Sequence, residues 1–206
     1  MSVVLIISAP SGSGKSTLAR HLVESDPQLD FSTSVTTRPP RPGDEEGKSY
    51  SFVSKDEFFA MRDRGDLLEW AEVFGNYYGT SRAVLDLARQ RGHDLLLDID
   101  VQGASQLMER LPEAVTVFIL PPSRTELESR LRNRSSDSNE VIERRLNDAA
   151  REVANLDQYD YVLVNDDLDE TLEELKSILA AERRRKGRMT GRIQSIIESF
   201  QIGTKI

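Results

Sequence analysis

The sequence contains no cysteine and only two histidines among its 206 residues. The absence of cysteine excludes disulfides and thiolate metal sites, and two histidines are too few for a structural zinc site. No apolar run approaches the ~20 residues of a membrane-spanning helix, and the first apolar run begins at Val3 without a basic leader. We therefore expect a soluble protein of the cytoplasm that does not bind a membrane.

Positive charge is also scarce, because 27 basic residues stand against 35 acidic ones and give a formal net charge of −8. This balance argues against a general binder of nucleic acid or of anionic membranes. An anionic ligand would have to meet a local cluster of positive charge. The chain length suits one substantial core with small additions, and we expect a single domain over residues 1–206.

Apolar runs alternate with helical patterns along most of the chain. The run at 3–8 (VVLIIS) and the runs at 94–100, 114–120 and 159–165 predict buried strands. Helical patterns are found at 15–25, 82–91, 103–110, 123–133, 139–156 and 168–183. This alternation predicts an α/β fold with a parallel sheet flanked by helices.

Three segments break this alternation. Residues 32–82 are rich in proline, glycine and aromatic residues and predict an inserted mixed α/β subdomain between core segments 1–31 and 83–183. Residues 132–140 (RNRSSDSNE) are polar and predict a short mobile lid. Residues 184–206 form a basic, then amphipathic, carboxy-terminal extension.

The stretch LIISAPSGSGKST at 5–17 has the order of a phosphate-binding loop, with a strand, a glycine-rich turn, a lysine and an amphipathic helix. Ala9 stands where the motif G-x-x-x-x-G-K-[ST] has its first glycine. Lys15 would reach the β- and γ-phosphates of a nucleotide, and the Ser16 hydroxyl would ligate Mg²⁺. The alternative is a strand-to-helix turn with a solvated lysine. The predicted ATP-binding loop comprises Ala9, Pro10, Ser11, Gly12, Ser13, Gly14, Lys15, Ser16 and Thr17.

Arg38 and Arg41 lie three residues apart on a proline-stiffened segment of the insert, and Tyr50 follows. Two guanidinium groups and a phenol can together bind one phosphate. A solvated charged loop is an equally good interpretation of this segment alone.

Four stretches taken together closely resemble the guanylate kinase family: the phosphate loop, TTRPPRPGDEEGKSY, LLEWAEVFGNYYGTS and LLLDIDVQG. They occur in the family's order between about residue 3 and residue 183. The resemblance implies Mg²⁺-dependent transfer of the ATP γ-phosphate to GMP, with GDP and ADP as products.

The resemblance also implies roles for individual residues. Ser34, Glu69 and Asp100 would contact the guanine base, with Thr80 nearby. Arg38, Arg41, Tyr50 and Tyr78 would bind the GMP phosphate. The full set implied for GMP is Ser34, Arg38, Arg41, Tyr50, Glu69, Tyr78, Thr80, Asp98 and Asp100.

A carboxylate suits guanine for a chemical reason. Guanine presents its N1–H and N2–H donors side by side, so one carboxylate can accept both, whereas adenine would leave that carboxylate unpaired. Such a mismatch can discriminate by ~10⁴ where the site is built around the hydrogen bond. Taken alone, Glu69 and Asp100 could equally be exposed carboxylates at strand or loop ends.

Asp98 ends an apolar strand, the position where P-loop enzymes hold Mg²⁺ or its waters. Ser16 and Asp98 are therefore the predicted metal residues. Because residues two apart on a strand share a face, we expect Asp98 and Asp100 to point into one cleft.

Arg134 and Arg145 match the family's lid arginines and are expected to close on the ATP phosphates, and Arg130 is a further candidate. The family's usual glycine after the first of them is Ser135 here. Positive charge closing on the transferred group is the main catalytic device of phosphoryl transfer. The predicted catalytic set is Lys15, Arg38, Asp98, Arg134 and Arg145. For Arg145 the alternative is a solvated helix face, and Asn165 is the expected contact near the adenine.

Two rival functions remain open from the sequence. Another nucleoside monophosphate kinase would share the loop and lid but not the set Ser34, Glu69 and Asp100. A protein-interaction module of guanylate-kinase-like fold would lack a working phosphate loop, whereas Lys15, Ser16 and Asp98 are present here.

The extension carries six basic residues between 183 and 192, followed by Ile193, Ile196, Ile197 and Phe200 at helical spacing. Basic amphipathic helices bind anionic membranes, but an apolar face of about two turns attaches only weakly. We expect these four residues to pack on the chain's own core or on a second copy of the chain, which would form a homo-oligomer.

Overall fold

The computed structural model describes residues 2–41, 43–48, 50–73, 75–134 and 138–201. A five-stranded parallel sheet lies at its centre, with the strand order β2-β7-β1-β8-β9. These strands are β1 (Val4–Ser8), β2 (Leu29–Phe31), β7 (Asp94–Asp98), β8 (Val115–Leu120) and β9 (Tyr161–Val164).

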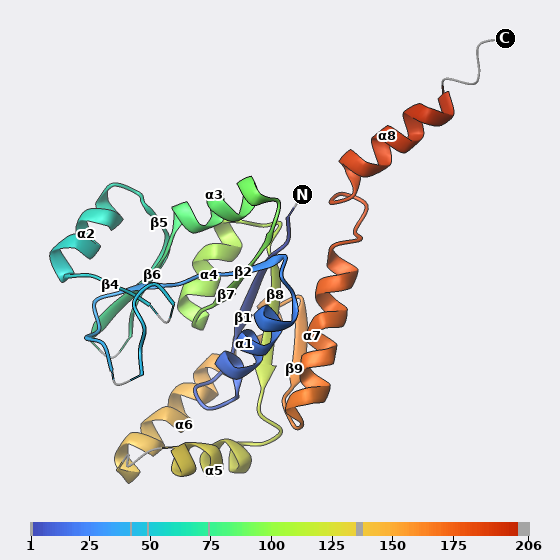
Figure 1. Cartoon of the computed structure of the whole chain (residues 1–206). Coiled ribbons are helices and arrows are strands. Elements are labelled where there is room, and N and C mark those ends of the chain that lie inside the picture. Colours follow the sequence, from blue (N-terminus) through green and yellow to red (C-terminus); the bar gives the residue numbers. More distant parts are fainter. Residues whose placement is uncertain (1, 42, 49, 74, 135–137, 202–206) are drawn as a thin grey trace.

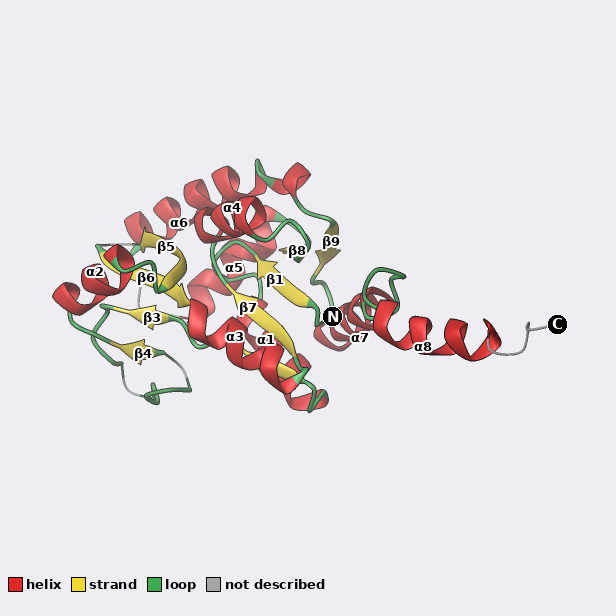
Figure 2. Ribbon diagram, turned by 90° about the horizontal axis from the view of Figure 1, so that it is seen from above, coloured by secondary structure: helices red, strands yellow, loops and turns green. Residues whose placement is uncertain are grey.

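Helices cover both faces of this sheet (Figures 1 and 2). Alternate residues of β1 divide between two cores: Leu5 and Ile7 pack with α1 (Lys15–Ser25) and α7 (Leu168–Glu182). Val4 and Ile6 pack on the other face with α3 (Arg82–Arg91) and α4 (Val101–Arg110). The run VVLIIS is continuously apolar because both of its faces are buried. The predicted α/β fold class is confirmed.

The helix and strand predictions differ from the structure mainly at the ends of elements. The helix predicted over 139–156 ends at Val153 and is followed by a separate 3₁₀ turn, η1 (Leu156–Gln158). The sequence analysis did not predict β2, which is only three residues long.

The insert forms a second sheet, with the order β4-β3-β6-β5, beside the central one (Figure 1). Its elements are β3 (Val35–Thr36), β4 (Ser51–Phe52), α2 (Lys55–Asp63), β5 (Leu67–Val73) and β6 (Asn76–Ser81). The helix α2 was not predicted individually. It begins where the Ser54 hydroxyl accepts the Glu57 N–H, and it buries Phe58 completely against Val35 and Leu67.

Two helices, α5 (Arg124–Arg134) and α6 (Asn139–Val153), pack on each other through a small apolar cluster of their own. The cluster consists of Leu127, Leu131, Ile142, Leu146 and Ala149. Residues 132–134 and 139–140 of the predicted lid belong to these helices, and 135–137 lie outside the described residues. The expected short polar lid therefore has helix ends on both sides.

The carboxy-terminal helix α8 (Thr190–Gln201) extends away from the rest of the molecule (Figures 1 and 2). Ile196, Ile197 and Phe200 are 50%, 44% and 79% exposed. The predicted packing of this face on the chain's own core is therefore wrong. Among the described residues, no helix has the length and apolar character to cross a membrane.

Candidate active site

The glycine-rich loop connects β1 to α1 at the carboxyl end of the central sheet. Gly12 and Gly14 have φ values of 99° and 88°, a left-handed conformation that favours glycine. Helix α1 begins at Lys15, so its amino-terminal N–H groups and positive dipole end lie beside the loop. Ala9 is 6% exposed and packs in the core with α1, which explains how a methyl group is accommodated there.

The loop is held by elements far away in the sequence. A Cβ atom at Gly12 would come within 3.0 Å of Leu127 and Leu131 on α5. The Asn165 amide donates from Nδ2 to the Ser13 carbonyl oxygen at 2.7 Å, and its Oδ1 accepts from the Thr171 hydroxyl at 3.4 Å. Asn165 is 4% exposed. It therefore positions the phosphate loop, while its expected contact with adenine stays a prediction.

Lys15 reaches across to the neighbouring strand β7. Its Nζ lies 2.7 Å from Oδ1 of Asp98 and donates to the Ile99 carbonyl oxygen at 2.8 Å. This meeting follows from the parallel register of β1 and β7, which pairs Ile7 with Asp98. The lysine predicted to bind phosphate is thus held by the carboxylate predicted to assist the metal.

Asp98 and Asp100 were predicted to lie two residues apart on one strand, but only Asp98 belongs to a strand. Strand β7 ends at Asp98, and Asp100 instead precedes α4, where its Oδ1 accepts the Gly103 N–H at 2.8 Å. The argument from alternating strand residues is therefore wrong. Asp100 owes its place to its role as the helix cap.

Glu69 is a buried carboxylate, not an exposed strand end. It is 3% exposed and lies on β5 opposite Thr80 of β6, whose hydroxyl donates to its Oε1 at 2.7 Å. A Cβ atom at Gly103 would lie 2.6 Å from Glu69 Oε2 and 3.2 Å from Asp100 Oδ1, so these groups share one space. Burial raises the pKa of Glu69 to about 7; the Thr80 hydroxyl lowers it and the Asp100 charge raises it further.

The insert presents an arginine enclosed by aromatic rings. The Arg38 side chain is 8% exposed, and its Nη2 lies 2.9 Å from Asp44 Oδ2. The guanidinium carbon lies 5.0 Å from the centre of the Tyr50 ring, which meets the Tyr78 ring edge to face at 5.9 Å. Burial raises the pKa of the Tyr50 phenol; the Asp98 charge raises it further and the Lys15 charge lowers it.

The remaining predicted insert residues lie at the margin of this cluster. Arg41 has an exposed side chain. Ser34 directly precedes β3 and is half-buried, and its carbonyl oxygen accepts the Ser51 N–H at 2.9 Å. Both roles stay predictions.

The three predicted lid arginines belong to α5 and α6. Arg130 donates through Nε to Glu126 at 2.8 Å and through Nη1 to the Asn165 carbonyl oxygen at 3.1 Å, so it lies beside the phosphate loop. Arg145 is half-buried on α6. Arg134 ends α5, and its side chain, like Ser135, lies outside the described residues.

The sequence analysis missed Glu152, at the end of α6. Glu152 is half-buried, and burial raises its pKa to about 7; the Lys15 charge lowers that pKa and the Asp100 charge raises it. The signal was present in the sequence, because Glu152 lies seven residues after Arg145 and therefore on the same helix face.

The residues predicted to hold a metal ion are Ser16 and Asp98. Among the described residues, no three carboxylate or imidazole side chains converge to form a complete metal cage. Ser16 and Asp98 supply oxygen donors, and Mg²⁺ commonly takes only one or two protein ligands together with phosphates and water. The donor set therefore fits Mg²⁺ carried by a nucleotide.

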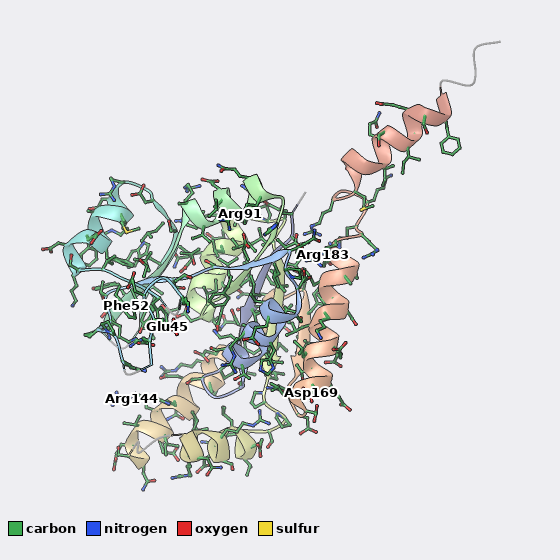
Figure 3. The ribbon with its side chains drawn as sticks, in the orientation of Figure 1. Glu45, Phe52, Arg91, Arg144, Asp169 and Arg183 are labelled. Atoms are coloured by element: carbon green, nitrogen blue, oxygen red, sulfur yellow. The ribbon has the colours of Figure 1, made fainter. Side chains whose placement is uncertain are left out.

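Figure 3 labels Glu45 and Phe52 in the insert and Arg144 on α6. Arg38 and Glu69 belong to the insert, whereas Asp98 ends strand β7 of the central sheet and Lys15 begins helix α1.

Comparisons with known proteins show the family of the chain. The family model of guanylate kinase matches residues 1–182. The chain is 53% identical to the guanylate kinase of Geobacter sulfurreducens over 94% of this chain and 96% of that protein. It is 51% identical to that of Geobacter metallireducens over 98% of both chains. The crystal structure of guanylate kinase from Anaplasma phagocytophilum superposes with a TM-score of 0.76 at 40% identity and covers 91% of this chain and 89% of the other.

Proposed function

Because the chain belongs to the guanylate kinase family, we propose that it transfers the γ-phosphate of ATP to GMP and yields GDP and ADP. The observation that carries this proposal is the buried Glu69 carboxylate, which shares one space with Asp100 and accepts a hydrogen bond from Thr80. A carboxylate 3% exposed is costly to bury unless a ligand supplies donors. Guanine supplies two adjacent donors on its N1 and N2 edge.

The GMP phosphate binds at the aromatic and arginine cluster of the insert. Arg38 supplies a guanidinium that is already ordered between Tyr50 and Asp44. Arg41, with its exposed side chain, closes on the phosphate from outside, and the Tyr50 and Tyr78 hydroxyls complete the site. Paired guanidinium and phenol donors suit the three oxygens of a monophosphate.

ATP places its phosphates on the glycine-rich loop. The first N–H groups of α1 receive the phosphate oxygens, and Lys15 moves its Nζ from Asp98 to the β- and γ-phosphates. Arg130, Arg134 and Arg145 then bring positive charge to the transferred group. Exchange of the Lys15–Asp98 ion pair for a Lys15–phosphate contact couples ATP binding to release of the Asp98 carboxylate.

Mg²⁺ would be held by the Ser16 hydroxyl and, directly or through water, by Asp98. When bound, it would neutralise charge on the transferring phosphates. The protein's own contribution is to align the two nucleotides and to exclude water between them.

A direct product assay tests this function. Purified protein with ATP, GMP and Mg²⁺ should form equal amounts of GDP and ADP on anion-exchange chromatography, and EDTA should abolish both. ADP formation without GDP would indicate a simple ATPase. No turnover with any monophosphate would favour the protein-interaction module, against which the Lys15–Asp98 contact speaks.

The exposed face of α8 supports a second, separate proposal. Three apolar side chains of this helix are exposed in the part of the chain that the structure describes: Ile196, Ile197 and Phe200. We propose that a second copy of the chain packs on them. Sedimentation should show an oligomer for the full chain and a monomer for a chain ending at Glu182. The same number of copies per particle for both chains would contradict the proposal. A cytoplasmic location likewise remains a proposal.

A further inference from the structure

One carboxylate oxygen in the insert joins the two arginine residues of the proposed phosphate site. Asp44 Oδ2 lies 2.9 Å from Arg38 Nη2 and accepts the backbone N–H of Arg41 at 2.7 Å. The Asp44 N–H in turn donates to the Arg41 carbonyl oxygen at 3.0 Å. Gly43, with φ of 92°, makes the turn that brings Asp44 back toward Arg41.

Arg38 is fixed on more than one side. Its Nη1 donates to the Pro39 carbonyl oxygen at 2.9 Å, and its guanidinium carbon lies 5.0 Å from the Tyr50 ring centre and 5.7 Å from that of Phe52. Among the described residues, these contacts occupy two of its five N–H donors. The other three remain for a ligand. Asp44 therefore orients the Arg38 guanidinium and leaves most of its N–H donors available.

Asp44 stays ionised at neutral pH. The Arg41 backbone N–H and the Arg38 guanidinium hold the pKa of its carboxyl below the ordinary value. The Asp44 side chain is 17% exposed, and its carboxylate already has two partners, the Arg38 guanidinium and the Arg41 N–H.

Two opposite roles are conceivable for such a carboxylate. It could occupy Arg38 in place of a phosphate and compete with GMP, or it could hold Arg38 in the orientation that GMP needs. The backbone bond from Arg41 favours the second role, because it holds Oδ2 through a main-chain group that a phosphate need not displace. A competing carboxylate would have to move away from Arg38 when GMP binds, whereas the Arg41 N–H holds the Asp44 carboxylate in the turn.

We infer that Asp44 is a positioning residue for GMP, whose carboxylate orders the Arg38 guanidinium and the Arg41 backbone into one monophosphate-binding unit. The inference rests on the proposed GMP kinase function. It concerns affinity for the phosphate of GMP alone, and it leaves the guanine contacts at Glu69 and the ATP site unchanged.

Asp44→Asn tests the inference, since an asparagine oxygen can still accept the Arg41 N–H while the charge facing Arg38 is lost. Glu45→Gln is the matched control: it removes a neighbouring charge that pairs with Lys48 and is 63% exposed. The measurements are KM for GMP, KM for ATP, kcat, and binding of GMP and of guanosine by calorimetry.

For Asp44→Asn we expect KM and Kd for GMP to rise about tenfold, with Kd for guanosine, KM for ATP and kcat within about twofold of the parent. Asp44→Glu should recover part of the GMP affinity, and Glu45→Gln should match the parent. A lower KM for GMP would show competition, an equal loss of guanosine binding would show a general structural role, and no change would show no role. Each of these overturns the inference. A parent protein that binds GMP but does not phosphorylate it would contradict the proposed function while calorimetry still tests Asp44.

Discussion

The Lys15 ammonium and the Asp98 carboxylate lie 2.7 Å apart, on the loop after β1 and at the end of the neighbouring strand β7. Their side chains are only 17% and 12% exposed. A lysine that a nucleotide phosphate must attract is therefore already ordered, and its present partner is a carboxylate that can hold a metal once the lysine has moved to the phosphate.

Lys15→Ala should lower kcat by at least ~10²-fold, because the charge on the transferring phosphates loses its nearest protein cation. The fold should persist, since Lys15 contributes no apolar contact to the core clusters. Lys176→Ala is the control, because that lysine forms an ion pair with Glu173 on the surface of α7, away from the phosphate loop. Turnover of purified, folded Lys15→Ala at the parent rate would refute the assignment of the phosphate loop.

Guanine binding should weaken as pH falls below about 7. Burial raises the pKa of Glu69 to about 7, and only the ionised carboxylate can accept both guanine donors. Below that value the Kd should rise ~tenfold for each pH unit. Guanosine is the ligand to use, because a phosphate monoester also titrates, at about pH 6.

Calorimetry with guanosine between pH 5.5 and 8.5 checks this, with Glu69→Gln as the comparison. The variant should bind weakly at every pH. A parent Kd that does not vary over that range would contradict an ionised Glu69 as the guanine acceptor.

Glu69→Gln should also stabilise the ligand-free protein, and only at higher pH. The pKa of this carboxyl is raised from 4.5 to about 7 by burial, so the folded state binds the proton more tightly than the unfolded state does. The stability linked to that proton is present below pH 4.5 and is lost as pH rises through 7. The variant should therefore gain up to about 3 kcal/mol over the parent at pH 8.5 and little at pH 5.

Urea unfolding of both proteins at pH 5 and pH 8.5 measures this difference. Taking the difference between variant and parent removes the contribution of Glu152, whose pKa is also raised to about 7 by burial. A gain of equal size at both pH values would mean that the effect does not come from ionisation of Glu69.

Arg38→Ala and Arg41→Ala should both raise KM for GMP about tenfold or more and leave KM for ATP nearly unchanged. They should differ in stability: Arg38 is 8% exposed and packs on Tyr50, whereas the Arg41 side chain is exposed. Thermal unfolding should therefore show a lower Tm for Arg38→Ala only. Equal losses for GMP and ATP would place both arginines on the path of the transferred phosphate.

Local patterns predicted most of the central fold. The apolar strands and the loop before Lys15 follow from short-range sequence. Asp100 and Asp167 cap helices with their own side chains, but the sequence analysis placed Asp100 on a strand and so began its helix two residues late. The family motifs predicted which carboxylates and arginines to expect near one another.

Contacts between distant segments could not be predicted in this way. The sharing of one space by Glu69 and Asp100 depends on how closely α4 approaches β5 at Gly103, which no local pattern encodes. The Arg38–Asp44 contact depends on the turn at Gly43. For the tail, packing on the chain's own core was wrong and packing on a second copy stays a prediction, because an amphipathic pattern shows that a helix has an apolar face but not what covers it.

The central claim is that this site phosphorylates GMP because Glu69 and its neighbours recognise guanine. One coupled assay of ADP release, run with GMP, AMP, UMP and dTMP as acceptors under the same ATP and Mg²⁺, tests it most directly. We predict that kcat/KM for GMP exceeds the others by ~10³-fold or more, since each of the other bases would leave the buried carboxylate without its two donors. AMP or a pyrimidine monophosphate phosphorylated as efficiently as GMP would contradict the claim.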